Sequence, residues 1–214
     1  MTTADLREFD RRAVHTTMTI AAHVVPEHLT RPTPCSEWTV GELLEHMTAQ
    51  HRGFAASARG CGDDLALWQP RRPGLHTRDD YLAAAQEVLV AFESPEVLDR
   101  PFAMPEFGTS VPGHVAVGMH LVDYVVHGWD LARALGIDYE LDDDLAEPTL
   151  RIAAAVPDGP QRMQPDSPFG PALPGGDEEP ALQRLLRMLG RSPSWPDAPA
   201  VASGSGRAGV DSAG

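Results

Sequence analysis

Four polar residues recur at helical spacing within the apolar run VAVGMHLVDYVVHGWDLARAL: His120, Asp123, His127 and Asp130. At 100° per residue their side chains fall within one narrow sector of a helix, and most of the remaining circumference is apolar. A helix that is apolar nearly all round is usually buried, so this polar face is expected to look into the protein. Buried imidazoles and carboxylates need partners. A divalent metal ion suits His and Asp one turn apart, so a metal site is the leading hypothesis.

The ligands of such a site must come from at least two helices. Asp123 and His127 are one turn apart, so both can reach a single ion. A third ligand is offered by the preceding region, where His46 and His51 are both available. Periodicity slightly favours His51 as the inward residue, because it lies nearer the centre of the apolar stripe on its helix. The flank that carries His46 can still face a neighbouring helix, so the pattern leaves both open.

Simpler interpretations of the same residues also exist. The stripe could be a solvated helix face, although Ala116 and Ala134 complete its sector where Arg or Glu would be usual. His120 is interpreted as a pocket wall, with ligand or second-shell donor as alternatives. Asp130 is expected to orient His127 through its second ring nitrogen, and a capping role is the alternative. For Cys35 a small apolar contact is favoured over a nucleophile.

The chain must supply helices that hold these residues. Apolar periodicity predicts helices over about residues 3–25, 39–60, 77–92 and 112–136, the second opening with a Thr39–Glu42 capping box. A hairpin or ordered loop is expected over 100–113, a shorter helix over 145–156, a loop over 157–177 and an amphipathic helix over 178–190. Four long helices predict a bundle. The expected organisation is a metal-binding bundle over 1–142, a small C-terminal region over 143–195 and a disordered tail over 196–214.

Composition narrows the class of partner. The net charge is −14 over 214 residues, which argues against a nucleic-acid partner because phosphate binding needs clustered cations. Two cysteines give no disulfide framework. The charged N-terminus and the absence of a long apolar run predict a cytoplasmic protein with no membrane partner. The basic residues are all Arg and there is no Lys or Asn, which is typical of a GC-rich genome.

Three stretches resemble a known family: TPCSEWTVGELLEHM, HLVDYVVHGWDLARALG and FGPALPGGDEEPALQRLLRMLGRSPSW. They are similar to signature stretches of the actinobacterial mycothiol-dependent maleylpyruvate isomerase family, within the DinB-like (YfiT-type) metal-binding superfamily. The resemblance covers about residues 5–195. It implies a mainly all-α fold, a DinB-like four-helix bundle with a short C-terminal α(+β) appendage. It also implies one divalent ion in an open three-ligand site formed by His46, Asp123 and His127, and so selects His46 over His51.

The resemblance also carries expectations about chemistry. The ion is expected to be zinc, with nickel, manganese or iron as alternatives, and mycothiol is the expected cosubstrate. The protein is then a metal- and thiol-dependent isomerase or S-transferase that activates a small thiol, or water, for reaction with a small electrophilic substrate. His120 is the expected catalytic residue, shuttling a proton. Monomer and homodimer are both compatible with the sequence.

Two departures from the family pattern are visible. The isomerase has Glu where this chain has the shorter Asp123, and its C-terminal domain supplies an Arg for substrate carboxylates. Here the candidates for that Arg are Arg151, Arg184 and Arg187. The alternatives in function are a non-catalytic metal or small-molecule binding protein, for resistance or sequestration, and a metal-dependent cyclase or hydrolase of specialised metabolism.

Overall fold

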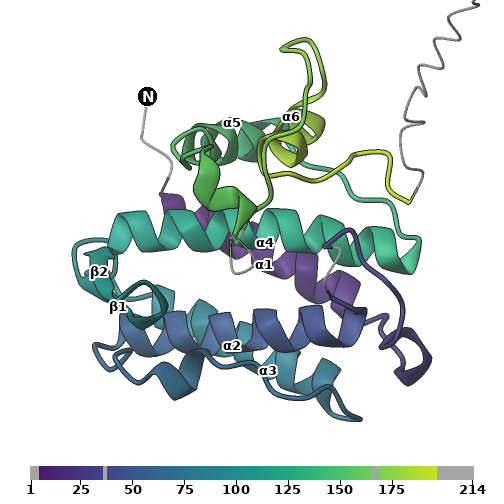
Figure 1. The fold of residues 1–214 in the computed structure, drawn as a ribbon. Helices are drawn as coiled ribbons and strands as arrows, with labels where there is room; N and C mark the ends of the chain where they lie inside the picture. The colour runs from purple at the N-terminus through teal and green to yellow at the C-terminus, as the bar shows by residue number, and fades with distance from the viewer. Residues whose placement is uncertain (1–4, 36–37, 165–166, 168, 197–214) are drawn as a thin grey trace, which may run out of the picture.

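The structure is a computed structural model that describes residues 5–35, 38–164, 167 and 169–196. This part of the chain forms helices and one two-stranded sheet (Figure 1). The helices are α1 (Leu6–Ala21), α2 (Val40–Ala58), α3 (Thr77–Phe92), α4 (Gly113–Leu135), α5 (Asp143–Ala153) and α6 (Ala181–Met188). The strands are β1 (Pro101–Met104) and β2 (Thr109–Pro112), paired antiparallel with Phe102 opposite Val111. None of the described helices combines the length and apolarity that crossing a membrane requires.

Local sequence explains where the long helices begin and end. The backbone N–H of Thr39 donates to Glu42 Oε2 (2.8 Å) and that of Glu42 to Thr39 Oγ1 (3.4 Å), so the predicted capping box opens α2. Gly136 ends α4 in the left-handed conformation (φ 73°), which glycine adopts without strain. The helix predicted over 3–25 ends earlier, at Ala21, and a 3₁₀ turn begins at Pro26.

The first four helices form the bundle that the sequence predicts. α1 packs against α3 and α4, and α2 packs against the same two helices. One close approach lies beside His127: a Cβ at Gly128 would be 2.7 Å from Thr17 Oγ1 of α1. The Thr17 hydroxyl is also within 3.1 Å of the Tyr124 carbonyl oxygen. Glycine at this position therefore lets α1 lie directly against α4 at the turn that carries His127.

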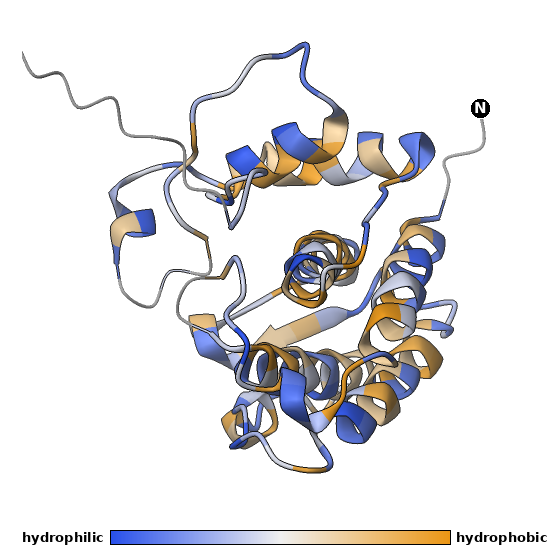
Figure 2. Cartoon of the chain, turned by 90° about the vertical axis from the view of Figure 1, so that its right-hand side faces the viewer, coloured by the Kyte–Doolittle hydropathy of each residue, from blue (hydrophilic) through white to orange (hydrophobic). Residues whose placement is uncertain are grey.

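The C-terminal region covers the opposite side of α4. α5 packs on α4 and α6 on α5, so α4 lies between two layers of helices (Figures 1 and 2). This position explains why α4 is apolar nearly all round. Leu145 of α5 and Leu185 of α6 belong to the same buried cluster as Leu121 and Val125 of α4. The predicted division at residues 142 and 143 thus falls within one hydrophobic core, and that domain boundary stays a prediction.

The strands lie elsewhere than the predicted α(+β) appendage implies. The described part of residues 143–196 contains helices, turns and loops without a strand, and the two-stranded sheet is the hairpin between α3 and α4. Phe102 in β1 is buried against a second apolar cluster that includes Trp68 and Val117. The hairpin therefore closes the end of the bundle near the start of α4. The predicted tail lies, beyond Pro196, outside the described residues.

Candidate metal centre

Three side chains with metal-binding atoms converge between α2 and α4. His46 comes from α2, and Asp123 and His127 come from consecutive turns of α4. One ligand atom of each lies within 4.8 Å of those of the other two. His127 Nε2 is 3.4 Å from Asp123 Oδ1. Donors bound to one tetrahedral zinc ion at about 2.0–2.1 Å lie about 3.3–3.4 Å apart, so the donor types and this spacing fit such an ion.

A buried carboxylate fixes the orientation of the His127 ring. His127 Nδ1 is 3.0 Å from Asp130 Oδ2, and the Asp130 side chain is fully buried. An ionised carboxylate only accepts hydrogen bonds, so the ring donates from Nδ1 and presents the lone pair of Nε2 toward Asp123. The relation expected between Asp130 and His127 is therefore present in the structure.

The His46 ring is covered by an aromatic neighbour. Trp38, which lies just before α2, has its ring centroid 4.3 Å from that of His46 at an interplanar angle of 31°. Burial, together with the adjacent His127, lowers the pKa of His46 to about 4. At neutral pH the imidazole is therefore uncharged, which is the form that binds metal ions.

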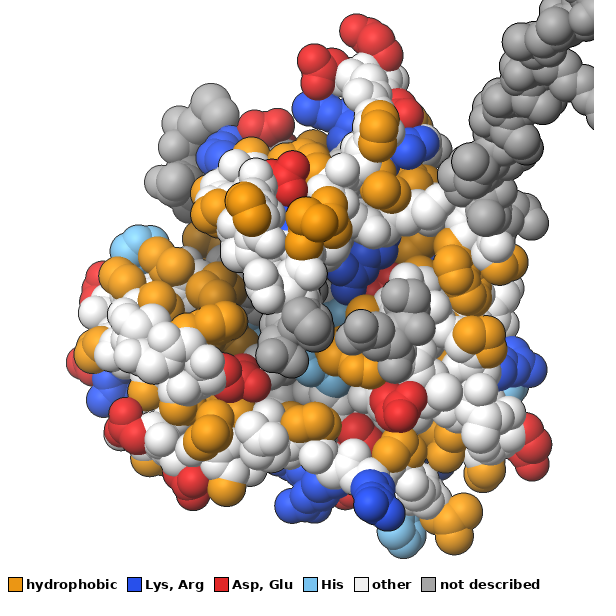
Figure 3. All heavy atoms as spheres, viewed as in Figure 1, with side chains coloured by type: hydrophobic (Ala, Val, Ile, Leu, Met, Phe, Trp, Pro, Cys, Tyr) orange, Lys and Arg blue, Asp and Glu red, His pale blue; other side chains and the backbone are white. Residues whose placement is uncertain are grey.

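Asp123 and His46 are both partly exposed, so solvent reaches this group. The Asp123 side chain is 22% exposed, whereas that of His127 is 3% exposed. Histidine side chains are visible in the middle of the face shown in Figure 3, between the layer formed by α5 and α6 and the helix α2 below it. His127 is therefore enclosed by protein, whereas Asp123 and His46 remain accessible.

The same two helices carry a second histidine cluster, which is closed. His120 Nδ1 is 2.6 Å from Asp10 Oδ1 of α1, and His120 Nε2 is 3.1 Å from His51 Nδ1 of α2. All three side chains are at most 1% exposed. The His51 ring stacks on Tyr124, with centroids 4.0 Å apart. These contacts form a hydrogen-bonded chain across the core of the bundle.

The structure thus separates the residues of the predicted stripe into two groups. Asp123 and His127 lie with His46, and Asp130 bonds to His127 behind them. His120 belongs instead to the buried hydrogen-bonded chain with His51. Both ring nitrogens of His120 are engaged there. Proton transfer by His120 stays a prediction.

Sequence reasoning did not single out Arg191, which approaches the metal centre from the C-terminal region. One guanidinium nitrogen of Arg191 lies 3.6 Å from Asp130 Oδ2, and the residue is 5% exposed. Two of the arginines considered from the sequence pair with local carboxylates instead, Arg151 with Glu147 and Arg187 with Glu179. The sequence feature that could have indicated Arg191 is the Gly190–Arg191 pair, which directly follows the amphipathic helix where the chain turns back toward the bundle.

The fold and the three donors define a class of protein, helical bundles with two histidines and one carboxylate held between two helices. Residues 11–132 match the family model described as the mycothiol maleylpyruvate isomerase N-terminal domain. This match covers more than half of the chain, and the protein belongs to that family. Two relatives from Mycobacterium tuberculosis, strains CDC 1551 and H37Rv, are each 33% identical over 187 residues. The alignment covers 85% of this chain and 95% of theirs, and both relatives are described as uncharacterized.

Solved structures agree with the fold. Crystal structures of the mycothiol-dependent maleylpyruvate isomerase and of a mutant of it superpose with TM-scores of 0.57 and 0.60. Each match covers 86% of this chain and 87% of the other, at 16% and 14% sequence identity. The shared architecture is the all-α, DinB-like bundle.

Proposed function

We propose that this protein is a metal-dependent enzyme that activates a small thiol, or water, for attack on a small electrophilic substrate. The reaction would be an isomerisation or an S-transfer. The observation that carries this proposal is the convergence of His46, Asp123 and His127 within 4.8 Å, with solvent access on the carboxylate side. Mycothiol is the thiol that family membership suggests.

The chain's own residues would divide the work as follows. His46 and His127 would hold the ion through neutral nitrogens, and Asp123 would supply one negative charge. Asp130 keeps His127 in the tautomer and orientation that binding needs. Trp38 packs against the His46 ring. A divalent ion held by these three residues would supply Lewis acidity, which would strongly acidify a thiol or water bound to it.

Zinc is the ion that this donor set favours. Two imidazoles and one carboxylate form a known type of catalytic zinc site. Nickel, manganese and iron use the same donor types and are the alternatives to test. Asp123 is shorter than the glutamate of the family pattern, so α4 would have to lie closer to the ion than a glutamate would require.

Cobalt substitution tests thiol activation directly, because Co²⁺ reports its ligands by absorption. We expect cobalt-loaded protein to gain a thiolate-to-cobalt charge-transfer band when mycothiol, or a cysteine derivative of similar size, is added. The matched hydroxyl compound, in which oxygen replaces sulfur, serves as the control and should not produce the band. Absence of the band at saturating thiol, with cobalt bound, would contradict thiol activation. That result would favour a metal-bound water mechanism or a non-catalytic site.

A further inference from the structure

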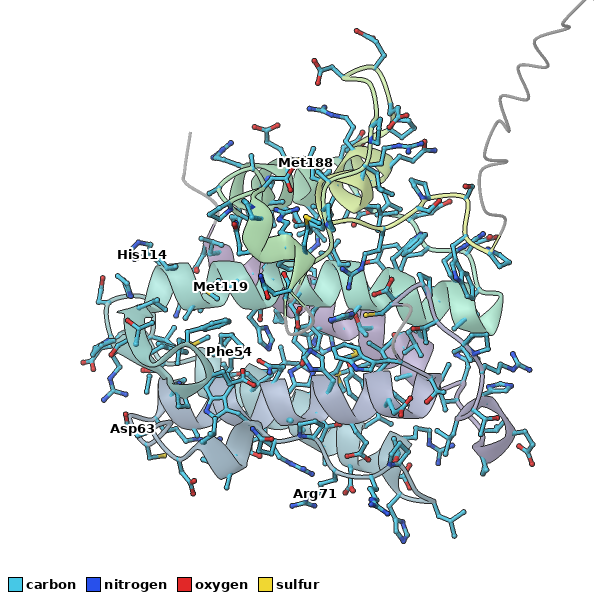
Figure 4. The ribbon with its side chains drawn as sticks, viewed as in Figure 1. Phe54, Asp63, Arg71, His114, Met119 and Met188 are labelled. Carbon is cyan, nitrogen blue, oxygen red and sulfur yellow. The ribbon has the colours of Figure 1, made fainter. Side chains whose placement is uncertain are left out.

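Arg191 is a buried cation outside the three proposed ligands. It follows α6, which ends at Met188 (labelled in Figure 4) and lies across α4 from α2 and α3. Only 5% of the residue is exposed. Burying a guanidinium is costly unless it is paired with an anion or hydrogen-bonded. Its contacts therefore show what the C-terminal segment is held against.

The anion that faces Arg191 is Asp130, the same carboxylate that accepts from His127. Asp130 Oδ2 is 3.0 Å from His127 Nδ1 and 3.6 Å from a terminal nitrogen of Arg191. The Asp130 side chain has no exposure to solvent, since its exposed fraction is zero. One carboxylate oxygen thus links a side chain of the C-terminal region to the ring of a proposed metal ligand.

Arg191 also contacts the segment that precedes α2. One of its terminal nitrogens is 3.6 Å from Cys35 Sγ, and the other donates to the Leu189 carbonyl oxygen at 3.0 Å. The backbone N–H of Trp38 in turn donates to the Cys35 carbonyl oxygen. Trp38 covers His46. The guanidinium is therefore linked to both histidines, to His127 through Asp130 and to His46 through Cys35 and Trp38.

We propose that Arg191 is a positioning residue through which docking of the C-terminal segment is coupled to metal binding between α2 and α4. This inference rests on the proposed metal centre. If the segment is docked, Arg191 neutralises Asp130 and holds it against His127. If the segment detaches, Asp130 is left with an uncompensated buried charge and must shift, which loosens the ring it orients. Because coupling is reciprocal, the bound ion must also stabilise the docked segment.

Zinc affinity of substituted proteins tests the first half of the coupling. We expect Arg191→Ala to weaken zinc binding about tenfold, the lower end of the effect of removing groups that orient metal ligands. The affinity is measured by competition with a chromophoric chelator. Arg191→Lys keeps a cation near Asp130 and should recover most of the affinity. Arg187→Ala is the matched control, because it removes another ion-paired arginine of the same region without touching Asp130.

Hydrogen exchange of the wild type tests the second half and needs no substitution of Arg191. We expect zinc to slow amide exchange in residues 181–191 of the wild type and to have no such effect in His127→Ala. If Arg191→Ala fails to fold, Arg191→Lys and this experiment decide the question. Wild type that binds no zinc would overturn the proposed function together with this inference. Wild type that binds zinc, with Arg191→Ala equally tight or with exchange in 181–191 unchanged, would overturn the coupling alone.

Discussion

Two histidine pairs lie between the same two helices, yet they differ in chemistry. His51 and His120 have ring centroids 5.2 Å apart, and His46 and His127 have theirs 5.3 Å apart. In the first pair two nitrogens face each other at 3.1 Å and share a hydrogen bond. In the second pair the rings meet edge to face at 75°. The distance between the two rings therefore does not distinguish a metal site from a hydrogen-bonded histidine pair.

What distinguishes the second pair is a third donor with access to solvent. Asp123 joins His46 and His127 and is 22% exposed. In the first pair the aspartate is Asp10, which is buried and already bonded to His120. In the first cluster the hydrogen bonds from Asp10 to His120 and from His120 to His51 lie inside the core, whereas in the second the donor atoms gather at a common point. The first is expected to stabilise the bundle and the second to bind an ion.

Breaking the closed cluster should produce the largest change in stability. Asp10→Ala removes the buried carboxylate that His120 bonds, and leaving that ring nitrogen without its partner costs about 3 kcal/mol of unfolding free energy. Zinc stoichiometry of the folded fraction should not change. Chemical denaturation measures the first quantity and elemental analysis the second. Asp10→Asn, which keeps an acceptor oxygen, is the control and should cost less. Loss of zinc in folded Asp10→Ala would mean that the two clusters are not independent.

Filling the metal centre should stabilise the fold by a smaller amount. A ligand that binds only the native state at one hundred times its Kd adds about 2.7 kcal/mol. We expect this gain on zinc addition to chelator-treated wild type, measured as the shift in the denaturation curve. His127→Ala should show no gain, whereas His51→Gln should retain it. An equal gain in wild type and His127→Ala would place the zinc elsewhere.

Acidification should destabilise the metal-free protein through both clusters. Burial holds the pKa of His51 well below its usual 6.5, and that of His46 at about 4. The unfolded chain therefore binds protons that the native state does not, so stability is complete above pH 6.5 and falls as pH drops toward 4. The expected slope is about 1.4 kcal/mol per pH unit for each histidine. Denaturation at several pH values should show a shallower slope for His51→Gln. An unchanged slope would contradict the burial argument.

The smallest effect is expected at the start of α2, the helix that carries both histidines. Thr39→Ala removes the hydroxyl that caps this helix, at a cost of about 1 kcal/mol. Because His46 lies nearer than His51 to the helix start, fraying should weaken zinc binding before it affects the closed cluster. Thr39→Ser retains the hydroxyl and is the control. Zinc affinity and denaturation midpoints of the two variants provide the comparison.

Sequence reasoning located the helices better than it located their partners. The bounds of α3 and α4, the capping box and the hairpin depend on local patterns, and the structure agrees with each of them. The preference for His51 as the inward residue describes its burial correctly, since His51 is fully buried. Periodicity measures burial within the bundle, however, and a metal ligand must also leave an approach for other molecules. His46, which is half-buried on the flank of its helix, leaves such an approach.

The partners that sequence could not supply come from distant parts of the chain. Asp10 pairs with His120 across 110 positions, and Arg191 meets Cys35 across 156. No periodicity connects such pairs, because they depend on how α1 and the C-terminal region pack on α4. The resemblance to a family selected His46, but it gave no indication of Arg191 beside Asp130. Long-range packing therefore decides which partners His120 and Asp130 of the stripe acquire.

Metal content of the purified protein tests the central distinction between the two clusters most directly. Elemental analysis is made of the wild type, His46→Ala, His127→Ala and His51→Gln, with circular dichroism to establish folding. The account predicts about one divalent ion per chain in the wild type and in His51→Gln, and none in the other two. A folded wild type that carries no ion and takes up neither zinc nor nickel would contradict the account. Retention of the ion by folded His46→Ala and His127→Ala would contradict it equally.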